Sequence, residues 1–492
     1  MQQIKKVVIA GGGTAGWLAG AALSKKLAGV VDVVLVESDE IGTVGVGEAT
    51  IPPMRVFHQL LGIDEQEFMR ATSATFKLGI EFENWGKLGE SYIHSFGNTG
   101  KGAWMCQFVH FWLRAKELGY SGEFGDYCYE LQAAKANKFG LSANMPPISY
   151  AYHLDATAYA KYLRAFSEKN GLQRVEGKIQ SVQQNDSTGF IESITLASGE
   201  CIEGDLFIDC TGFRGVLIEQ TLNTGYEDWS HWLPCDSAAA VQTESSGEPI
   251  PYTKSIARES GWQWRIPLQH RTGNGLVYCS HYLTDVDAIN QLQQNLDGKA
   301  LTDPRTIKFR TGRRRKIWNK NCVALGLSSG FLEPLESTSI YLFMIGISRL
   351  MQSFPFSGIY PSVIDEFNNT AIDELEKIRD FIILHYKVTD RDDTPFWRYC
   401  KNMDIPDSLA QRIELFKEYG HIFQLDGELF RIDSWTQVML GQGIVPKQYH
   451  HVTQTMTDRE LQSFLAAIKN GINQAVEKLP AHHDFIKSYC KI

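Results

Sequence analysis

The sequence predicts an α/β protein with a parallel β-sheet in its N-terminal part and a mainly helical C-terminal part. Near the N-terminus, an apolar segment is followed by glycines and then by a helical pattern. Two later apolar segments, ending near residues 209 and 325, are again followed by small residues. From about residue 351 the apolar residues recur at helical spacing, as in 362–386 and 457–479.

The first element is a strand, a turn and a helix within "KKVVIAGGGTAGWLAGAALSKKL". Its glycines have the G-x-G-x-x-G spacing. In that motif the first glycine allows the tight turn, the second lets the backbone approach a pyrophosphate, and the third lets the helix pack on the strand. The N–H groups at the start of the helix favour phosphate. The expected cofactor contacts here are Gly11, Gly13, Thr14, Ala15 and Gly16.

The second strand, "VDVVLVES", ends at Glu37, which lies 21 residues after Gly16. An acidic side chain at this distance accepts hydrogen bonds from a ribose. The glycine motif alone is weak, since it could be a plain glycine-rich turn. Strand, turn, helix, second strand and acid together predict a dinucleotide site.

The remaining βα junctions favour FAD over NAD. No second complete G-x-G-x-x-G occurs in the chain. "GTVGVGEATIP", which contains Ala49, suits a loop that passes close to a flat ring. "DLFIDCTGFRG" and "NCVALGLSSGFLEPLEST", which contains Leu325, are further strands followed by small residues. Junctions spread over so much of the chain predict a Rossmann-type FAD-binding fold, similar to that of flavin monooxygenases.

Composition excludes several classes of protein. The net charge of −9 argues against a nucleic-acid partner, and we expect the basic run 310–318 to be a solvated strand edge near the cofactor site. The apolar run 340–347 is far shorter than the roughly 20 residues of a membrane span. No secretory signal is found at the N-terminus. Nine cysteines without a Cys-x-x-Cys pair predict reduced thiols in a cytoplasmic protein. The histidine pairs 450–451 and 482–483 are expected at the surface, with no metal site.

Several separated motifs resemble the flavin-dependent tryptophan halogenase family. They are "GGGTAGW", "GVGEATIP", "FKLGIEFENW", "GWQWRIPL" and "SGFLEPLESTSIY", in this order over roughly the first 350 residues. The resemblance implies halogenation of an aromatic ring with FADH₂ from a separate reductase, O₂ and a halide ion. It also implies that Trp262 and Trp264 lie near the flavin and keep organic substrate away from it. The alternative is a pair of core tryptophans in a strand.

The resemblance also assigns the reacting groups. Lys77 would direct hypohalous acid at one ring carbon, although a lone lysine at a strand start is usually solvated. Glu336 would polarise the oxidant, stabilise the cationic ring or take its proton. Pro334 and Ser337 are expected to mark the start of a helix. By resemblance, the N–H groups of Thr338 and Ser339 would bind halide, and the substrate contacts would be His94, Phe96 and Ser337.

Two features depart from the family pattern. Ser339 stands where the family usually has glycine, which leaves halide preference open. The segment 418–443 is shortened and lacks the paired tyrosines and the Phe-Trp pair that contact free tryptophan. Since burying an unpaired charge is costly, we expect indole or another uncharged aromatic to be the better substrate. A free-tryptophan halogenase, a flavin-dependent aromatic hydroxylase and a non-enzymatic FAD-binding protein remain alternatives.

The expected organisation is an FAD- and halide-binding module over residues 1–350, with a substrate-facing insertion at about 84–150. A helical substrate-side region would follow over 351–492. The sequence leaves the native substrate, the halogenated position and the oligomeric state open, a homodimer being one such state. Bromide is favoured over chloride only because it is easier to oxidise.

Overall fold

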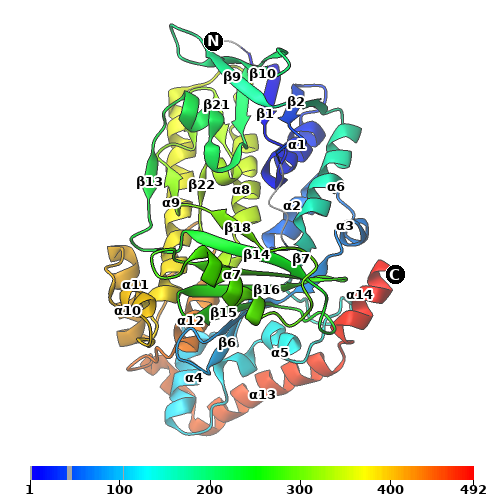
Figure 1. The fold of residues 1–492 in the computed structure, drawn as a ribbon. Coiled ribbons are helices and arrows are strands. Elements are labelled where there is room, and N and C mark those ends of the chain that lie inside the picture. The colour runs from blue at the N-terminus through cyan, green and yellow to red at the C-terminus, as the bar shows by residue number, and fades with distance from the viewer. Residues whose placement is uncertain (1–2, 42–46, 104, 492) are drawn as a thin grey trace. The chain divides into compact units, whose positions relative to one another are not determined.

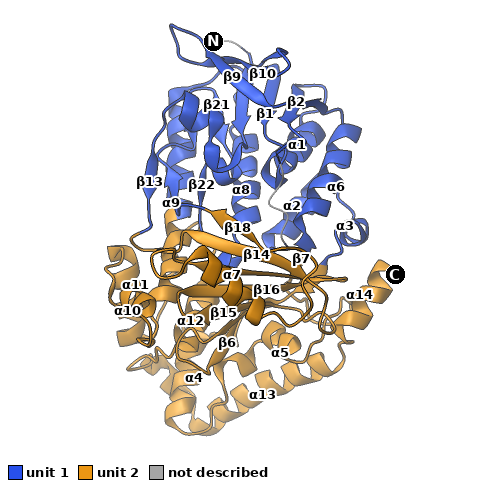
Figure 2. Ribbon diagram, viewed as in Figure 1, with its two compact units in different colours: residues 1–74, 154–230, 309–375 blue, residues 75–153, 231–308, 376–492 orange. Residues whose placement is uncertain are grey.

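A computed structural model describes residues 3–41, 47–103 and 105–491 of the chain (Figure 1). The chain divides into two compact units, each built from three stretches (Figure 2). Unit 1 contains residues 1–74, 154–230 and 309–375, and unit 2 contains 75–153, 231–308 and 376–492. The predicted α/β class is confirmed: unit 1 has a largely parallel sheet, and the described residues after 351 form helices and loops only.

Unit 1 is centred on a six-stranded sheet in the order β20-β21-β12-β1-β2-β8. The five strands from β21 to β8 are parallel, and β20 is antiparallel to β21. The chain runs from β1 to β2 on one side and returns to β12 on the other, which creates a topological switch point beside β1. The strands are β1 Lys6–Ala10, β2 Asp32–Glu37, β8 Gln173–Glu176, β12 Leu206–Asp209, β20 Trp318–Asn319 and β21 Cys322–Ala324.

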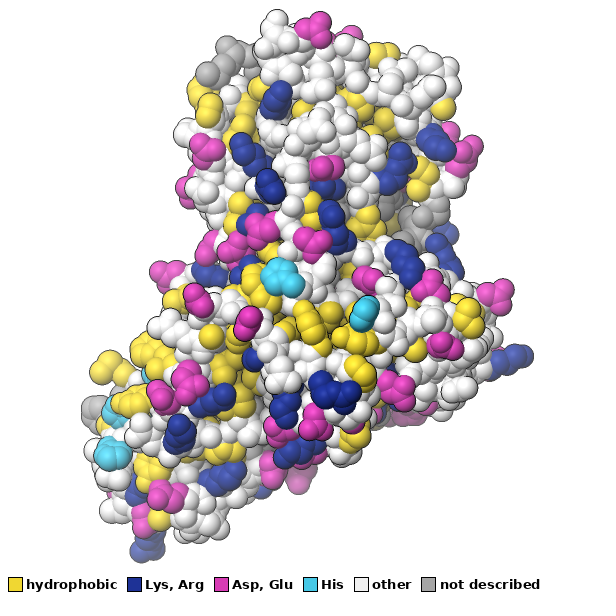
Figure 3. Space-filling model, turned by 60° about the vertical axis from the view of Figure 1, so that its left-hand side comes forward, with side chains coloured by type: hydrophobic (Ala, Val, Ile, Leu, Met, Phe, Trp, Pro, Cys, Tyr) yellow, Lys and Arg dark blue, Asp and Glu magenta, His cyan; other side chains and the backbone are white. Residues whose placement is uncertain are grey.

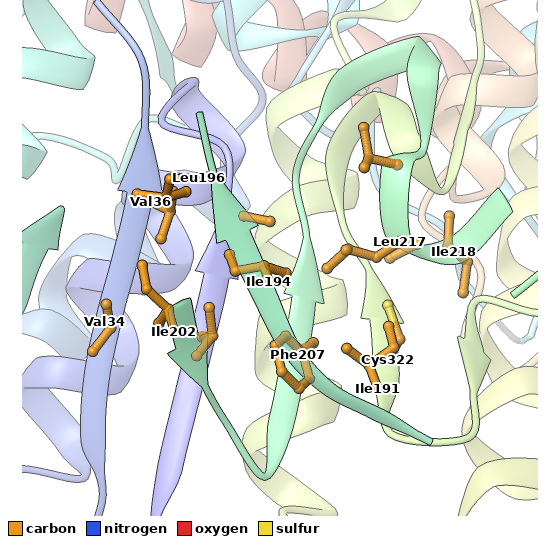
Figure 4. Close-up of a cluster of buried hydrophobic side chains, with 14 residues drawn as sticks. Val34, Val36, Ile191, Ile194, Leu196, Ile202, Phe207, Leu217, Ile218 and Cys322 are labelled. Carbon is orange, nitrogen blue, oxygen red and sulfur yellow. The ribbon is translucent and has the colours of Figure 1, made fainter. Parts of the chain in front are cut away.

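Both faces of this sheet are covered, which explains why its strands are continuously apolar. On one face a three-stranded antiparallel sheet packs against β1, β2 and β12, and its side chains Ile191, Ile194 and Leu196 meet Val36 and Phe207 in a buried cluster (Figure 4). The helix α1 packs against α6 and α8. The covering elements are β9 Ile179–Gln184, β10 Ile191–Leu196, β11 Cys201–Glu203, α1 Thr14–Lys26, α6 Ala156–Lys169 and α8 Ser339–Gln352.

The other elements of unit 1 connect these layers. A second small sheet has the order β13-β19-β22. The elements are β3 Gly47–Ala49, α2 Pro53–Leu61, α3 Glu65–Ala71, a π-helix Val216–Thr221, β13 Tyr226–Asp228, β19 Gly312–Arg314 and β22 Gly330–Phe331; short 3₁₀ turns lie at Gly212–Arg214, Gly326–Ser328 and Pro334–Glu336. The helix α9 Pro361–Lys387 begins in unit 1 and ends in unit 2.

Unit 2 is centred on a seven-stranded sheet in the order β18-β14-β17-β16-β15-β5-β6. Neighbouring strands pair antiparallel, except that β5 and β15 pair parallel to each other. Because side chains alternate along a strand, this sheet has two different faces. One carries the cluster of Ala239, Leu276 and Tyr278 under α7. The strands are β5 Gly79–Glu83, β6 Ser91–Ser95, β14 Ser237–Thr243, β15 Thr253–Arg258, β16 Gly261–Pro267, β17 Thr272–Tyr278 and β18 Arg305–Lys308.

A short strand pair and several helices complete unit 2. Strand β4 pairs antiparallel with β7, with Lys77 opposite Ala151. The predicted helices over 362–386 and 457–479 are confirmed as α9 and α13, and Thr457 caps α13. The elements are β4 Thr75–Lys77, β7 Ala151–Asp155, α4 Phe108–Glu117, α5 Tyr129–Lys135, α7 Asp285–Gln294, α10 Pro395–Asn402, α11 Asp407–Tyr419, α12 Ile432–Gly441, α13 Asp458–Glu477 and α14 His482–Cys490, with 3₁₀ turns at Phe124–Tyr127 and His451–Thr455.

The sequence-based division at residue 350 was drawn by ligand-binding role, whereas the compact units are drawn by packing. Residues 84–150 belong to unit 2. The assignment of residues 1–350 to flavin and halide, and of 351–492 to substrate, stays a prediction.

Two surface expectations are wrong in part: Arg310, Arg315 and Lys316 of the basic run are exposed as expected. Arg313 and Arg314 of the basic run are buried in β19, the central strand of its small sheet, where they pair with Glu227 and Glu219. Ion pairs with a neighbouring strand (Glu227) and with the π-helix (Glu219) therefore compensate these buried charges. His482 is also buried, with both ring nitrogens hydrogen-bonded, whereas the pair at 450–451 is exposed.

Charged side chains of both signs are interspersed over the face shown in Figure 3, with no large basic patch. Among the described residues, no helix has the length and hydrophobicity needed to cross a bilayer. The same residues contain no group of three or more His, Cys, Asp or Glu side chains placed to bind a metal ion. All nine cysteines are free thiols.

Candidate active site

The glycine turn after β1 has the backbone that a dinucleotide site needs. Gly11 has φ +109°, and a Cβ there would lie 2.3 Å from the Cys210 oxygen. A Cβ on Gly16 would lie 1.9 Å from the Gly11 oxygen, so this glycine allows the helix to approach the turn. Beyond its chain neighbours, no atom in the described part of the chain lies within 4 Å of the Gly13 Cβ position. The structure therefore packs protein against the first and third glycines and leaves space at the second.

The helix α1 starts without a cap, which leaves donors for an anion. Gly13 is the N-cap residue, no side chain caps the helix, and the first turn has no acidic residue. The first N–H groups of a helix have no intrahelical acceptor and carry a partial positive charge. Thr14, Ala15 and Gly16 therefore supply N–H donors that fit the pyrophosphate of a dinucleotide.

Three neighbouring parallel strands end at this same edge of the sheet. β1, β12 and β21 lie side by side, and the backbone links their ends: Cys210 N donates to Ala10 O (2.8 Å) and Leu325 N donates to Asp209 O (2.9 Å). A Cβ on Gly326 would lie 2.6 Å from the Ala15 Cβ, so the turn after β21 packs on the start of α1. The expected convergence of three βα junctions is thus present in the fold. Leu325 is 2% exposed and Ala49 7% exposed.

Glu37 lies at the end of β2 as expected. Its carboxylate accepts hydrogen bonds from Arg174 Nε (2.6 Å) and Trp17 Nε1 (3.2 Å). A Cβ on Gly12 would lie 1.6 Å from Glu37 Oε2, so the carboxylate lies against the glycine turn. The side chain is 15% exposed. These partners fix the carboxylate where a ribose hydroxyl could reach it.

Part of the loop expected beside the flat ring, residues 42–46, lies outside the described residues. The following residue pair is described: Gly47 and Glu48 begin β3. Burial raises the pKa of Glu48 to about 7. This carboxyl therefore holds a proton more readily than an ordinary glutamate.

The turn expected to bind halide differs in detail from the prediction. Pro334–Glu336 form a 3₁₀ turn, Ser337 adopts the left-handed conformation (φ +59°), and α8 begins at Ser339 with Thr338 as N-cap. The expected helix start at Pro334 and Ser337 is therefore wrong, because the left-handed Ser337 interrupts the helical path. The reversal turns the chain sharply just before the helix.

This revised helix start still suits a small anion. Thr338 is completely buried, its side chain does not cap the helix, and its Oγ1 has no hydrogen-bond partner among the described residues. The first turn of α8 contains no acidic residue. A buried, uncapped helix N-terminus leaves N–H donors unsatisfied, and an anion satisfies them. Glu336 is 1% exposed, directly before this turn.

Lys77 is the last residue of β4, and its side chain is completely buried. After Lys77 the chain leaves the β4 pairing at Leu78 and joins a different sheet as β5. The alternative of a solvated lysine is wrong. Burying an ammonium is costly, so this position is one where a function for the charge is expected.

The Lys77 ammonium lies over an aromatic ring. Its Nζ is 5.1 Å from the centroid of the Phe96 ring, a cation–π distance. Phe96 follows β6 directly, is half-buried, and donates its N–H to Leu78 O (2.9 Å). His94 is 2% exposed and packs against Phe381 (5.6 Å) and Phe430 (6.2 Å). The structure thus brings Lys77 and Phe96 together, with His94 in the adjoining aromatic packing.

Both tryptophans of "GWQWRIPL" lie on the same face of β16, as the alternation predicts. Their ring centroids are 6.1 Å apart, and both side chains are buried. Trp264 lies opposite Gly275 on β17, where a Cβ would come within 2.1 Å of the indole. Their expected place beside the flavin stays a prediction, since they belong to unit 2.

Sequence reasoning missed the residues that support these groups. Asp209 is buried at the end of β12, and its carboxylate accepts from the backbone N–H groups of Thr211, Leu217 and Ile218. Gln437 bonds to Ser95 N (2.8 Å) and Gly97 O (3.3 Å) on either side of Phe96. Of these two residues, only Asp209 could have been found from the sequence, because it is an acidic residue at the end of an apolar strand.

Comparison with known proteins agrees with this geometry. The family described as tryptophan halogenase matches residues 6–458. The tryptophan 7-halogenase RebH of Lentzea aerocolonigenes is 34% identical over 532 aligned positions, covering 99% of this chain and 98% of the relative. Two solved structures are also similar. The flavin-dependent halogenase Xcc4156 from Xanthomonas campestris is 55% identical, covers 99% of both chains and has a TM-score of 0.98. The flavin-dependent halogenase BrvH from Brevundimonas sp. BAL3 is 43% identical, with 99% of both chains covered and a TM-score of 0.95. Because the family model matches residues 6–458 of the 492, the chain belongs to the tryptophan halogenase family and is an enzyme of the flavin-dependent halogenase class.

Proposed function

We propose that the protein halogenates an uncharged, electron-rich aromatic, with indole or a simple indole derivative as its substrate and bromide as the preferred halide. FADH₂ comes from a separate flavin reductase, and O₂ is the co-substrate. The bound flavin supplies the chemistry that oxidises halide to hypohalous acid. The observation that carries the proposal is the completely buried Lys77 with its ammonium beside Phe96.

Residues of unit 1 fit the cofactor and the halide. The open Gly13 position and the N–H groups of Thr14 and Ala15 would hold the FAD pyrophosphate, and Glu37 the ribose. The N–H groups of Thr338 and Ser339 would hold the halide at the start of α8. Ser339 keeps this N–H donor where the family usually has glycine, and its side chain adds volume.

Lys77 would orient the oxidant toward the ring. Its ammonium donates hydrogen bonds to hypohalous acid, whose halogen is then transferred to a ring carbon. The oxygen–halogen bond breaks, a carbon–halogen bond forms, and the leaving hydroxide becomes water on taking up a proton. Glu336 would accept the proton that leaves the ring carbon. Phe96 and His94 would contact the aromatic substrate, and Ser337 would lie beside it.

The aromatic packing beside His94 favours a substrate without charges. Phe430 stacks on Phe381 with centroids 3.8 Å apart, and Trp435 packs on Phe381 edge-on at 4.9 Å. Arg412 lies over the Trp435 ring (4.2 Å) and pairs with Glu428 (2.6 Å). A zwitterionic amino acid needs partners for both charges, and this arginine is already engaged.

The alignment with RebH is longer than this chain. It extends over 532 positions, more than the 492 residues of this chain, so the relative carries residues that this chain lacks. This agrees with a shortened segment over 418–443. Free tryptophan, the substrate in the name of that relative, is the alternative substrate.

A product assay tests the proposal. The protein is incubated with a flavin reductase, NADH, FAD, O₂, bromide and an equimolar mixture of indole and tryptophan, and products are identified by mass spectrometry. We expect bromoindole in large excess over bromotryptophan, and loss of both with Lys77→Ala. A chloride reaction run in parallel ranks the halides.

Three results would contradict the proposal. Preference for tryptophan refutes the substrate assignment, and hydroxylated products without bromine refute halogen transfer. Unchanged bromination by Lys77→Ala refutes the role of the lysine. The control variant Lys138→Ala removes a lysine that bonds to the carbonyls of Val476 and Glu477 at the end of α13, and it should brominate like the wild type.

A further inference from the structure

Strand β4, which carries Lys77, has a neighbouring strand along one edge and a histidine along the other. On the first edge it pairs with β7, with Thr75 opposite His153. On the second, the N–H group of Phe76 donates to Nε2 of His482 (3.2 Å), which lies 406 residues later in the chain. His482 is the first residue of α14 and is completely buried.

The two bonds of His482 fix its protonation. Nδ1 lies 2.7 Å from the carbonyl oxygen of Pro249, which can only accept. Nδ1 therefore carries the proton, and Nε2 is the acceptor that binds Phe76 N–H. The imidazole thus connects the loop at Pro249 to the backbone of β4, directly before Lys77.

The residue after Lys77 is held by the same loop. Leu78 N donates to the carbonyl of Pro251 (2.7 Å). Pro249, through His482, and Pro251, directly, therefore fix the backbone on both sides of Lys77. Leu78 O in turn accepts a hydrogen bond from Phe96 N (2.9 Å). The same loop therefore also supports Phe96, whose ring lies beside the Lys77 ammonium.

The helix α14 also covers the side chain that precedes Lys77. The Phe76 ring is completely buried and lies 5.6 Å from Phe485 and 5.7 Å from Tyr489, both on α14. Hydrogen bonds anchor the start of the helix, since His482 N donates to Asn137 O (3.0 Å). The C-terminal helix is thus part of the support of β4.

We infer that His482 is a positioning residue for Lys77, and that it couples oxidation of the halide to halogenation of the aromatic substrate. The inference rests on the proposed role of Lys77 as the group that directs the oxidant. A buried backbone N–H and a buried carbonyl left without partners would force β4 and the loop to shift. A displacement of 1 Å at a reacting group can lower its rate by about 100-fold, and oxidant that is not directed at the ring is lost to the solution.

The test compares substitutions at His482 with one at its neighbour. His482→Leu removes both hydrogen bonds. In His482→Gln the amide oxygen takes the place of Nε2 and can accept from Phe76 N–H. In His482→Asn the shorter amide stands near Nδ1 and keeps the bond to Pro249 only. The control is His483→Leu, because His483 is a partly exposed neighbour that bonds to the exposed Glu248.

Each full-length variant is loaded with one equivalent of FADH₂ and mixed with O₂, bromide and indole. The bromoindole formed per enzyme is measured in one sample, and free oxidised bromine is captured by monochlorodimedone in another. We expect His482→Leu and His482→Asn to form about tenfold less bromoindole and to release correspondingly more free oxidant. His482→Gln should recover most of the coupling, and His483→Leu should match the wild type.

A purely structural role would give a different pattern. Fewer active molecules would lower bromoindole and trapped oxidant in proportion, with the ratio of brominated isomers unchanged, and that result overturns the inference. Equal ratios of bromoindole to free oxidant in His482→Asn and His482→Gln also overturn the inference. If His482→Leu does not fold, the comparison of these two variants is the test. If Lys77→Ala remains fully coupled, the proposed function of the lysine fails and the inference fails with it. If Lys77→Ala is uncoupled and His482→Leu is not, the inference alone fails.

Discussion

Replacing Gly13 by alanine should weaken flavin binding without lowering the stability of the flavin-free protein. Apart from its two chain neighbours, no atom of the described residues lies within 4 Å of the position that the new methyl group would occupy, and the Gly13 backbone is extended (φ −74°), which alanine tolerates. In a compatible conformation, a glycine-to-alanine change stabilises a protein by roughly 0.4–1 kcal/mol through the unfolded state. The unfolding temperature of the flavin-free protein should therefore stay the same or rise slightly.

The loss in affinity can be estimated from the same geometry. The methyl group would occupy the space through which we expect the pyrophosphate to approach the N–H groups of α1. Each hydrogen bond to a charged group contributes about 1.5–3 kcal/mol, and about 1.4 kcal/mol corresponds to a tenfold change in Kd. Loss of one or two such bonds removes about 1.5–6 kcal/mol and should weaken FAD binding by about 10- to 20,000-fold, as measured by titration of flavin fluorescence.

Gly16→Ala provides the contrast. Its Cβ would lie 1.9 Å from the Gly11 oxygen, so the helix must move by more than an ångström. Overpacking of this kind costs roughly 1–3 kcal/mol, and both FAD affinity and the unfolding temperature should fall. Gly247→Ala, also with nothing within 4 Å of its Cβ position, should change neither. A wild-type Kd for FAD in Gly13→Ala would refute the placement of the pyrophosphate.

Three further predictions concern unit 2. Gln437→Leu leaves the buried Ser95 N–H without its acceptor and should lower the free energy of unfolding by about 1–3 kcal/mol, measured by urea denaturation; a change below 0.5 kcal/mol would contradict the bonding described. Burial lowers the pKa of His482 to about 4 from 6.5, so the folded state binds fewer protons than the unfolded state between these values, and stability is lost as the pH falls through this window. In His482→Gln the loss between pH 6.5 and 4 should be shallower by up to about 1.4 kcal/mol per pH unit, and identical pH profiles of the two proteins would show that this histidine does not titrate as described. Phe430→Ala should remove the ring stacked on Phe381, cost about 3–5 kcal/mol of stability and admit larger aromatic substrates, as a panel of substituted indoles would reveal by product yield; an unaltered ranking of substrates would place Phe430 outside the substrate site.

The flavin part of the molecule could be predicted because its chemistry depends on backbone and spacing. The positions of Gly11, Gly13 and Gly16 identify a turn, and Glu37 lies at the end of β2 where the spacing placed it. Continuous apolar segments identified the strands that meet at this turn, since a parallel sheet is covered on both faces. These signals are local in the chain, which is why they could be found in the sequence.

The supports of the candidate site could not be predicted in the same way. His482 contacts Phe76 across 406 positions, and Gln437 contacts Ser95 across 342. Nothing in the local sequence distinguishes such residues from solvated ones, so His482 was expected at the surface. The helix start near Ser337 was wrong for a related reason, because a left-handed residue of a type other than glycine gives no sequence signal.

The two histidines beside β4 show how the fold tolerates a buried lysine. Thr75 Oγ1 donates to Pro267 O (2.8 Å), so it must accept from Nδ1–H of His153 (2.9 Å), whose Nε2 accepts from Thr253 (3.0 Å). His153 is thus neutral with the same tautomer as His482. Desolvation, and then the charge of Lys77, lower the pKa of His153 well below 6.5.

The two histidines must therefore stay neutral in order to hold strand β4 in place. A proton on Nε2 of His482 would turn an acceptor into a donor facing the Phe76 N–H group, and a proton on His153 would place a second positive charge near Lys77. Either event would weaken the hold on β4 and raise the cost of the buried ammonium. The low pKa of each histidine follows from the burial that allows it to hold the strand, so acid should release the Lys77 strand as these side chains become charged.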